Sequence, residues 1–232
     1  KGQLLFTPTE RWEARVLFTG ERARDGDYAL SDLAGLRANP FHSSRTIEGF
    51  TRRNIVSPTV HVSHTGPKID FSTVTGFVWW KTDDLTDLDY TALPLATRNN
   101  TEQDFQFTEE FRLASSKAAP ISLSDRVALK WQAGVFVFTQ NYEQDAINNY
   151  SPFVLSPFLG VPVSQHSPQS TLDDNGLGVY GQSTWTFSNK LDVTVGARGD
   201  REHKQANLST FFSPALSPVA VVNAERDFSD VS

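Results

Sequence analysis

The residues of this sequence that could bind a metal ion are its histidines and one acidic run. Of the five histidines, only His61 and His64 are close to each other. Positions i and i+3 of a strand point to opposite faces, so this pair cannot chelate one ion without a bulge. The run from Asp83 to Asp89 offers carboxylates but lacks the EF-hand loop pattern. We therefore expect no metal site, and we expect a solvated loop at the acidic run.

Catalytic and cofactor-binding patterns are also missing from the sequence. Without cysteine there is no thiolate nucleophile, no thiolate zinc site and no disulfide framework. No GxGxxG, Walker or GxSxG motif occurs. The net charge of −6 provides no large basic field for a nucleic acid. The sequence predicts neither an enzyme nor a cofactor.

The remaining candidates are polar side chains that recur at alternate positions of amphipathic segments. In LDVTVGAR (191–198), Leu191, Val193 and Val195 share one face, and Thr194 and Arg198 share the other. Such alternation is typical of a strand with one apolar side. If the polar side lines the lumen of a barrel, the lumen-facing candidates are Glu110, Arg112, Lys130, Gln132, Gln182, Arg198 and Asp200.

A period of two extends over most of the chain, and no segment shows a sustained period of 3.6 residues. Residues 188–190 form a tight turn between the last two complete strands of the pattern. A ninth strand begins at Asp227. The eight complete strands cover approximately residues 2–6, 12–22, 54–64, 69–81, 103–115, 127–141, 177–187 and 191–198.

Short and long connections alternate along the chain. The short ones are 7–11, 65–68 and 188–190, the long ones are 23–53, 82–102, 142–174 and 202–226, and 116–126 is of medium length. Outer-membrane barrels have short periplasmic turns and long extracellular loops, whereas a soluble sandwich has no reason for this asymmetry. Ten residues, tilted by about 45°, span roughly 23 Å, close to the apolar band of such barrels.

Aromatic residues fall near strand ends, where a membrane barrel places its girdles. The girdle candidates are Phe77, Trp79, Trp80, Phe136, Phe138, Tyr142, Trp185 and Phe187.

Two features do not fit a membrane barrel. Pro58 has no backbone N–H to donate to a neighbouring strand, so its strand should begin later or carry a bulge. Glu109 shares the apolar side and would face lipid unless a bulge intervenes.

Four stretches carry a resemblance to a known family. They are FTEEFRLAS (107–115), KWQAGVFVF (130–138), GVYGQSTWTFSNKLDVTVGAR (178–198) and DFSDVS (227–232). In this order they resemble the middle of the β-barrel domain of TonB-dependent outer-membrane receptors, which import iron chelates and other scarce nutrients. The resemblance is densest over residues 103–201 and thin before residue 54.

The resemblance implies an all-β fold, a transmembrane antiparallel up-and-down barrel of 22 strands, of which residues 1–232 supply eight and the start of a ninth. It also implies a location in the outer membrane of a Gram-negative bacterium. The partners it implies are outer-membrane lipid, a plug domain that is not in this sequence, and a small ligand such as a ferric siderophore. It also implies contact with TonB through an N-terminal segment that is not in this sequence. The expected function is active import without chemical change.

Several alternatives stay open. The lumen-facing side chains could contact a plug, or could pair laterally within the wall. The chain could be a passive outer-membrane porin or a small eight-stranded barrel, or a soluble β-sandwich that binds carbohydrate through its aromatic residues. Ligand contact is expected from aromatic residues in the long loops, namely Tyr142, Tyr150, Phe153 and Phe158, although loop packing explains them equally well.

Overall fold

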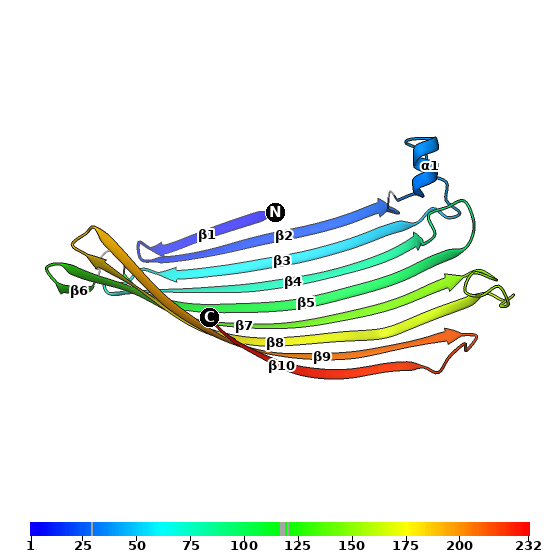
Figure 1. Cartoon of the computed structure of the whole chain (residues 1–232). Coiled ribbons are helices and arrows are strands. Elements are labelled where there is room, and N and C mark those ends of the chain that lie inside the picture. The colour runs from blue at the N-terminus through cyan, green and yellow to red at the C-terminus, as the bar shows by residue number, and fades with distance from the viewer. Residues whose placement is uncertain (29, 117–118, 120) are drawn as a thin grey trace.

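The computed structural model describes residues 1–28, 30–116, 119 and 121–232. Within them, one curved antiparallel sheet contains every strand, with β1 and β10 at its two edges (Figure 1). The elements in chain order are β1 (Gly2–Thr9), β2 (Trp12–Gly26), α1 (Leu33–Ala38), β3 (Phe50–His64), β4 (Ile69–Asp87), β5 (Ala96–Ser115), β6 (Ile121–Ser124), β7 (Val127–Tyr150), β8 (Val163–Phe187), β9 (Leu191–Ser213) and β10 (Ala220–Val231).

Each strand of the main path pairs with its neighbours in the sequence, so the predicted up-and-down order is confirmed. Tight turns join the strands at one end of the sheet, and longer segments join them at the other (Figure 1). The turn before β9 has positive φ at Ser188 (51°) and Asn189 (54°), as a tight hairpin requires. The predicted alternation of connections therefore reflects two different ends of one sheet.

The short strand β6 continues the line of β5 along β7. Ala114 of β5 faces Gln132, and Ile121 of β6 faces Leu129. Ala114 and Ile121 are therefore seven positions apart, whereas their partners on β7, Gln132 and Leu129, are only three positions apart. Within the connection predicted over 116–126, residues 121–124 form β6 and a tight turn joins β6 to β7, while residues 117, 118 and 120 lie outside the described part of the chain.

The strands reach much further toward the longer connections than the sequence pattern predicts. β7, β8 and β9 have 24, 25 and 23 residues. The predicted loop over 142–174 was wrong in extent, because only 151–162 lies outside the two strands. Both faces of these extensions are polar, so no alternation marks them as strands in the sequence.

Pro58 lies inside β3 without a bulge, so the expected late start of this strand was wrong. Val56 pairs with Trp79 and Thr59 pairs with Gly76, which is an unbroken register on either side of Pro58. Pro58 lacks an N–H group, but it still lies opposite Phe18 of β2. Neighbouring residue pairs hold the register across the missing donor.

The six-residue helix α1 was not predicted, because it is too short to show a helical period. Asp32 caps it by accepting a hydrogen bond of 2.6 Å from the backbone N–H of Gly35. Across the described residues, we find no helix whose length and apolar character would suit a membrane crossing.

A buried acidic pair attaches the α1 segment to the end of β4. Asp87 is fully buried and accepts hydrogen bonds from the backbone (3.0 Å) and hydroxyl (3.1 Å) of Thr46. The Asp87 backbone donates to Asp27, which pairs with Arg45 at 2.8 Å. The solvated loop expected at the acidic run was therefore wrong, because Asp83, Asp84 and Asp87 all belong to β4. The charge of Asp87 is balanced by backbone donors and lies beside the ion pair of Asp27 with Arg45.

Candidate functional site

We call the face of the sheet that carries Leu191, Val193 and Val195 the outer face, and the opposite one the inner face. These three side chains are 58%, 41% and 62% exposed, so no second layer of the described chain covers them. Hydrophobic residues that are buried are confined to Ala146 and Val163 among the described residues. This arrangement differs from a β-sandwich, in which the apolar face packs against a second sheet.

The outer face carries a continuous apolar band next to the tight turns. On β8, Leu177, Val179, Trp185 and Phe187 share this face, as predicted, and Asn175 ends the band. The predicted alternation on β9 is confirmed in the same way. The band covers residues 12–18 of β2, 56–64 of β3, 69–79 of β4, 105–113 of β5, 127–137 of β7, 177–187 of β8 and 191–197 of β9.

The apolar band crosses the hydrogen-bonded rows of the sheet obliquely. We call the margin of the band nearest the tight turns its lower margin and the opposite one its upper margin. Trp12, at the lower margin on β2, lies in the same row as Ala197, at the upper margin on β9. The lower margin on β9 is Leu191, so between β2 and β9, which are six strands apart, the lower margin moves down by six residues. One residue of about 3.3 Å per strand spacing of about 4.8 Å corresponds to a tilt of roughly 35°. A level apolar band therefore requires strands tilted as in a barrel.

Aromatic residues at the upper margin of the band pack together on the outer face. The ring centroid of Phe77 lies 6.1 Å from that of Phe105 and 5.0 Å from that of Phe107. Other predicted girdle residues lie on the inner face instead, because their strand parity is opposite to that of the band: Trp80, Phe136, Phe138 and Tyr142.

Three glycines on the inner face lie opposite aromatic residues of the neighbouring strand. Gly134 of β7 faces Tyr180 of β8, and a Cβ atom at Gly134 would lie 2.5 Å from the tyrosine ring. The Tyr180 hydroxyl therefore passes over β7 and donates a hydrogen bond of 2.5 Å to Glu110 of β5. The other two pairs are Phe136 with Gly178 and Phe138 with Gly176.

The seven lumen-facing candidates all share the inner face, and several of them pair within the wall. Arg198 donates to Asp200 on the same strand at 2.7 Å and 2.8 Å. Arg112 donates to Ser72 of the next strand at 3.2 Å. The full set on this face is Glu110, Arg112, Lys130, Gln132, Gln182, Arg198 and Asp200.

His61 and His64 lie on opposite faces of β3, as the i, i+3 spacing predicts. The ring of His64 lies 4.6 Å from that of Trp12 on the outer face. His61 borders a hollow of about 510 Å³ near the tight turns, together with Arg112 and Gln132. Within the residues described, no group of three or more histidine and acidic side chains is arranged so that it could hold a metal ion.

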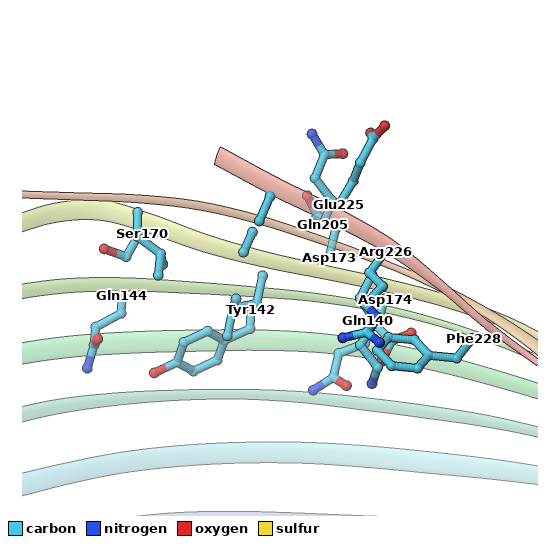
Figure 2. Close-up of a pocket in the computed structure, with 15 residues that line it drawn as sticks. Gln140, Tyr142, Gln144, Ser170, Asp173, Asp174, Gln205, Glu225, Arg226 and Phe228 are labelled. Atoms are coloured by element: carbon cyan, nitrogen blue, oxygen red, sulfur yellow. The ribbon is translucent and has the colours of Figure 1, made fainter. Parts of the chain in front are cut away.

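A hollow of about 790 Å³ lies over β7–β10, beyond the apolar band. Figure 2 shows the side chains of Tyr142 and Phe228 on one side of the sheet, and those of Gln205 and Glu225 on the opposite side. Aromatic rings, amides and charged groups of the inner face border it. They are Gln140, Tyr142, Gln144, Asp174, Lys204, Arg226 and Phe228.

Charges in this hollow are closely paired. The Lys204 ammonium lies 2.6 Å from Asp174 and 2.9 Å from Glu202, and its hydrogen bonds to the two carboxylates raise the pKa of Lys204. The Arg226 guanidinium lies 5.0 Å from the centre of the Phe228 ring. The hollow thus combines aromatic surface with cations whose charge is compensated in part by neighbouring carboxylates.

A network of amides next to this hollow was missed by the sequence analysis. The Gln144 side-chain amide donates at 2.9 Å both to Asn100 and to Glu102. Gln140 donates to Asp104 at 3.0 Å, and Asp104 is only 4% exposed. The sequence held no signal for the network, because its members are about forty positions apart and only the register of β5 and β7 joins them.

The four residues predicted as ligand contacts in loops divide into two groups. Tyr142 and Tyr150 belong to β7, so their placement in a loop was wrong. Phe153 and Phe158 lie between β7 and β8 and are 62% and 95% exposed. Tyr142 is half-buried against Trp80, with ring centroids 6.1 Å apart. Of the four, only Tyr142 borders the large hollow.

Comparison with known proteins gives one kind of match. No protein-family model matches the chain, and no curated protein matches it in sequence. In structure, the chain is similar to the ferric yersiniabactin uptake receptor FyuA from Yersinia pestis, with a TM-score of 0.69 and 14% identity. The match covers 99% of this chain and 33% of that receptor, so the chain spans about a third of its length.

A likeness at this identity shows the fold alone. The antiparallel up-and-down order, the tight turns at one end and the single sheet all agree with the expectation drawn from the resemblance to TonB-dependent receptors. The edge strands β1 and β10 do not pair with each other, so the sheet is not closed. The chain therefore has the fold of a portion of the β-barrel of such a receptor.

Proposed function

We propose that this chain is part of an outer-membrane transporter that imports a scarce nutrient, with a ferric siderophore or a similar iron chelate as the expected ligand. The outer face contacts lipid through its apolar band. The inner face lines the barrel and contacts a plug domain and the ligand. Energy comes from TonB through a segment outside residues 1–232.

The observation that carries this proposal is the geometry of the apolar band. Exposed leucine, valine and aromatic side chains form one continuous surface, which would be costly in water. Between β2 and β9 both margins of the band drop by six residues over six strand steps, which is an average of one residue per strand, as a level hydrocarbon layer requires of tilted strands. On β7 and β8 the band is eleven residues long, which spans roughly 25 Å or slightly more at this tilt.

The inner face supports the choice of an importer that binds its ligand. The 790 Å³ hollow has the size and mixed lining of a small-molecule site. Tyr142 and Phe228 supply aromatic surface, and Lys204 and Arg226 supply cations for a ligand that carries carboxylates or phenolates. Residues of the inner face nearer the tight turns, such as Arg112 and Lys130, would contact the plug.

The position of the membrane is tested with single-cysteine labels, because the chain has no cysteine of its own. Environment-sensitive probes at Val193→Cys and Val195→Cys should report an apolar environment in lipid, and a probe at Thr194→Cys a wet one. Equal exposure at the three positions would contradict the proposal, since the register places Thr194 on the opposite face.

The transport function is tested with the complete protein in iron-starved cells. Uptake of a radioactive ferric chelate should require this protein, and it should stop when TonB is deleted. Uptake that persists without TonB would favour a passive channel instead. Loss of Tyr142 and Phe228 by replacement with alanine should weaken ligand binding more than loss of Phe153 and Phe158, because the first two border the hollow.

A further inference from the structure

Four basic side chains gather on the outer face immediately above the apolar band. Arg22 of β2 and Lys81 of β4 lie in the first row above the band, joined through Asn54 of β3. Arg24 and Arg52 lie in the next row. All four side chains are exposed. We call these four residues the basic cluster.

Few anions compensate the basic cluster. On the outer face of β2–β5 above the band, the carboxylates among the described residues are Asp83, 3.7 Å from Arg52, and Asp87. Asp87 is fully buried at the end of β4, where it accepts hydrogen bonds from Thr46. Arg24 donates to the neutral Asn54 side chain at 2.9 Å. The Arg52 guanidinium lies 4.1 Å from the centre of the Phe50 ring, which supports it from one side. The cluster therefore keeps a net positive charge.

The other half of the sheet has the opposite character at the same height. Above the band on β7–β10, the ionisable side chains of the outer face are mainly carboxylates, and Arg201 and His203 lie close to Asp227. The positive charge is therefore confined to β2–β4 and does not extend along the whole upper margin of the band. The carboxylates of this other half include Glu143, Asp173, Glu225 and Asp227.

We propose that the basic cluster binds the phosphate groups of anionic lipids in the leaflet at the long-loop end of the sheet. This inference rests on the proposed membrane position, because the band then places the four cations at the level of the lipid headgroups. Guanidinium groups form paired hydrogen bonds with phosphate oxygens, so three arginines and a lysine suit this headgroup.

The position of the cluster favours a lipid over a soluble anion. Val56 and Trp79 end the band one row below Asn54 and Lys81, and both are exposed on the same face. A lipid can place its acyl chains on these residues and its phosphate on the cluster at once. Free phosphate or an acidic protein would use the cations and leave the adjoining apolar surface without a role.

The test measures which lipid lies beside the cluster. The complete protein carries a fluorophore at Val56→Cys and is reconstituted in phosphatidylcholine vesicles with a fifth of the lipid brominated. Brominated phosphatidylglycerol should quench the label more strongly than brominated phosphatidylcholine. Each cation near the surface favours an anionic lipid by roughly fivefold, so we expect an enrichment of about fivefold or more.

Matched variants and a second label serve as controls. A label at Leu177→Cys, at the upper end of the band on β8, should show no preference for the anionic lipid. Combining Arg22→Gln, Arg24→Gln, Arg52→Gln and Lys81→Gln should bring the enrichment at Val56 to about one, whereas Arg201→Gln should leave it unchanged.

The outcomes separate this proposal from the proposed function. Equal quenching by the two brominated lipids at Val56 would overturn the phosphate site while leaving the membrane position intact. No quenching by either lipid at Val56 or Leu177 would overturn the membrane position itself. Loss of the enrichment on adding millimolar inorganic phosphate at constant ionic strength would assign the cluster to a soluble anion and overturn the lipid.

Discussion

Thr75 donates a hydrogen bond of 2.5 Å from its hydroxyl to Oε2 of Glu109, in the middle of the apolar band of the outer face. Thr73 donates to the other carboxylate oxygen. The register of β4 and β5 is unbroken there, so no bulge intervenes and Glu109 lies on the apolar side, as its parity predicts. Two hydroxyl donors from the adjacent strand therefore allow a carboxyl group to lie on a face that is otherwise apolar.

Removing the two hydroxyl donors should destabilise the protein more than removing the carboxyl group. We expect Thr73→Val with Thr75→Val to cost about 1–3 kcal/mol, because Glu109 would then lie unpaired in the apolar band. Glu109→Leu, which removes the unpaired group, should restore the stability of that double variant. Denaturant unfolding in lipid measures all three. A double variant as stable as the wild type would contradict this role of the threonines.

Gly134→Ala should destabilise the wall of the barrel by about 1–3 kcal/mol, because the added Cβ would collide with the ring of Tyr180. Gly199→Ala is the matched control, since nothing lies within 4 Å of the position of its Cβ. In a Tyr180→Ala background, Gly134→Ala should lose most of its cost. Equal unfolding free energies for the two alanine variants would show that Tyr180 does not pass over Gly134.

Tyr142 should ionise at unusually high pH. Burial and then the nearby charge of Glu102 raise the pKa of Tyr142 to about 12, beyond the apolar band. Since the folded pKa lies above the ordinary value of about 10, the protonated phenol contributes stability up to about pH 10, and this contribution is lost as the pH rises toward 12. Tyrosinate absorbance of wild type minus Tyr142→Phe measures the midpoint.

The contribution of Glu102 to the ionisation of Tyr142 is tested separately. Glu102→Gln should lower the pKa of Tyr142, because it removes a negative charge that disfavours the phenolate. Glu143→Gln is a suitable control, since Glu143 lies on the outer face. A midpoint unaffected by Glu102→Gln would assign the shift to burial alone.

The loop after β4 should lose order in acid. Burial alone would raise the pKa of Asp89, but hydrogen bonds from Thr91, Leu95 and Ala96 outweigh it and lower the pKa of Asp89. A lowered pKa means that the stability is present above the ordinary value of about 4 and is lost as the pH falls through the folded value.

Hydrogen exchange checks this expectation at the amides that donate to Asp89. The Ala96 N–H donates at 2.9 Å and the Leu95 N–H at 3.2 Å. After correction for intrinsic rates, their protection should fall as the pH drops below about 4, the ordinary value for an aspartate. In Asp89→Asn, protection should be lower at neutral pH and independent of pH. Protection that stays constant in the wild type would exclude the carboxylate as the anchor of this loop.

Alternation in the sequence was sufficient to predict which side chains share a face wherever the two faces differ in polarity. Successive residues of a strand point to opposite sides, so Leu191 and Thr194 were separated correctly without any knowledge of their neighbours. The tight turn at Ser188 and Asn189 was predicted for a similarly local reason, since its short polar residues tolerate positive φ.

Only the tertiary structure decided how far the strands extend and which residues meet across them. The upper halves of β7 and β8 are polar on both faces, so no period distinguished them from loops, and Tyr142 was misplaced for that reason. Which residues of different strands share a row depends on register, which is set by long-range pairing. The contact of Tyr180 with Glu110 and the basic cluster around Arg52 arise from register alone.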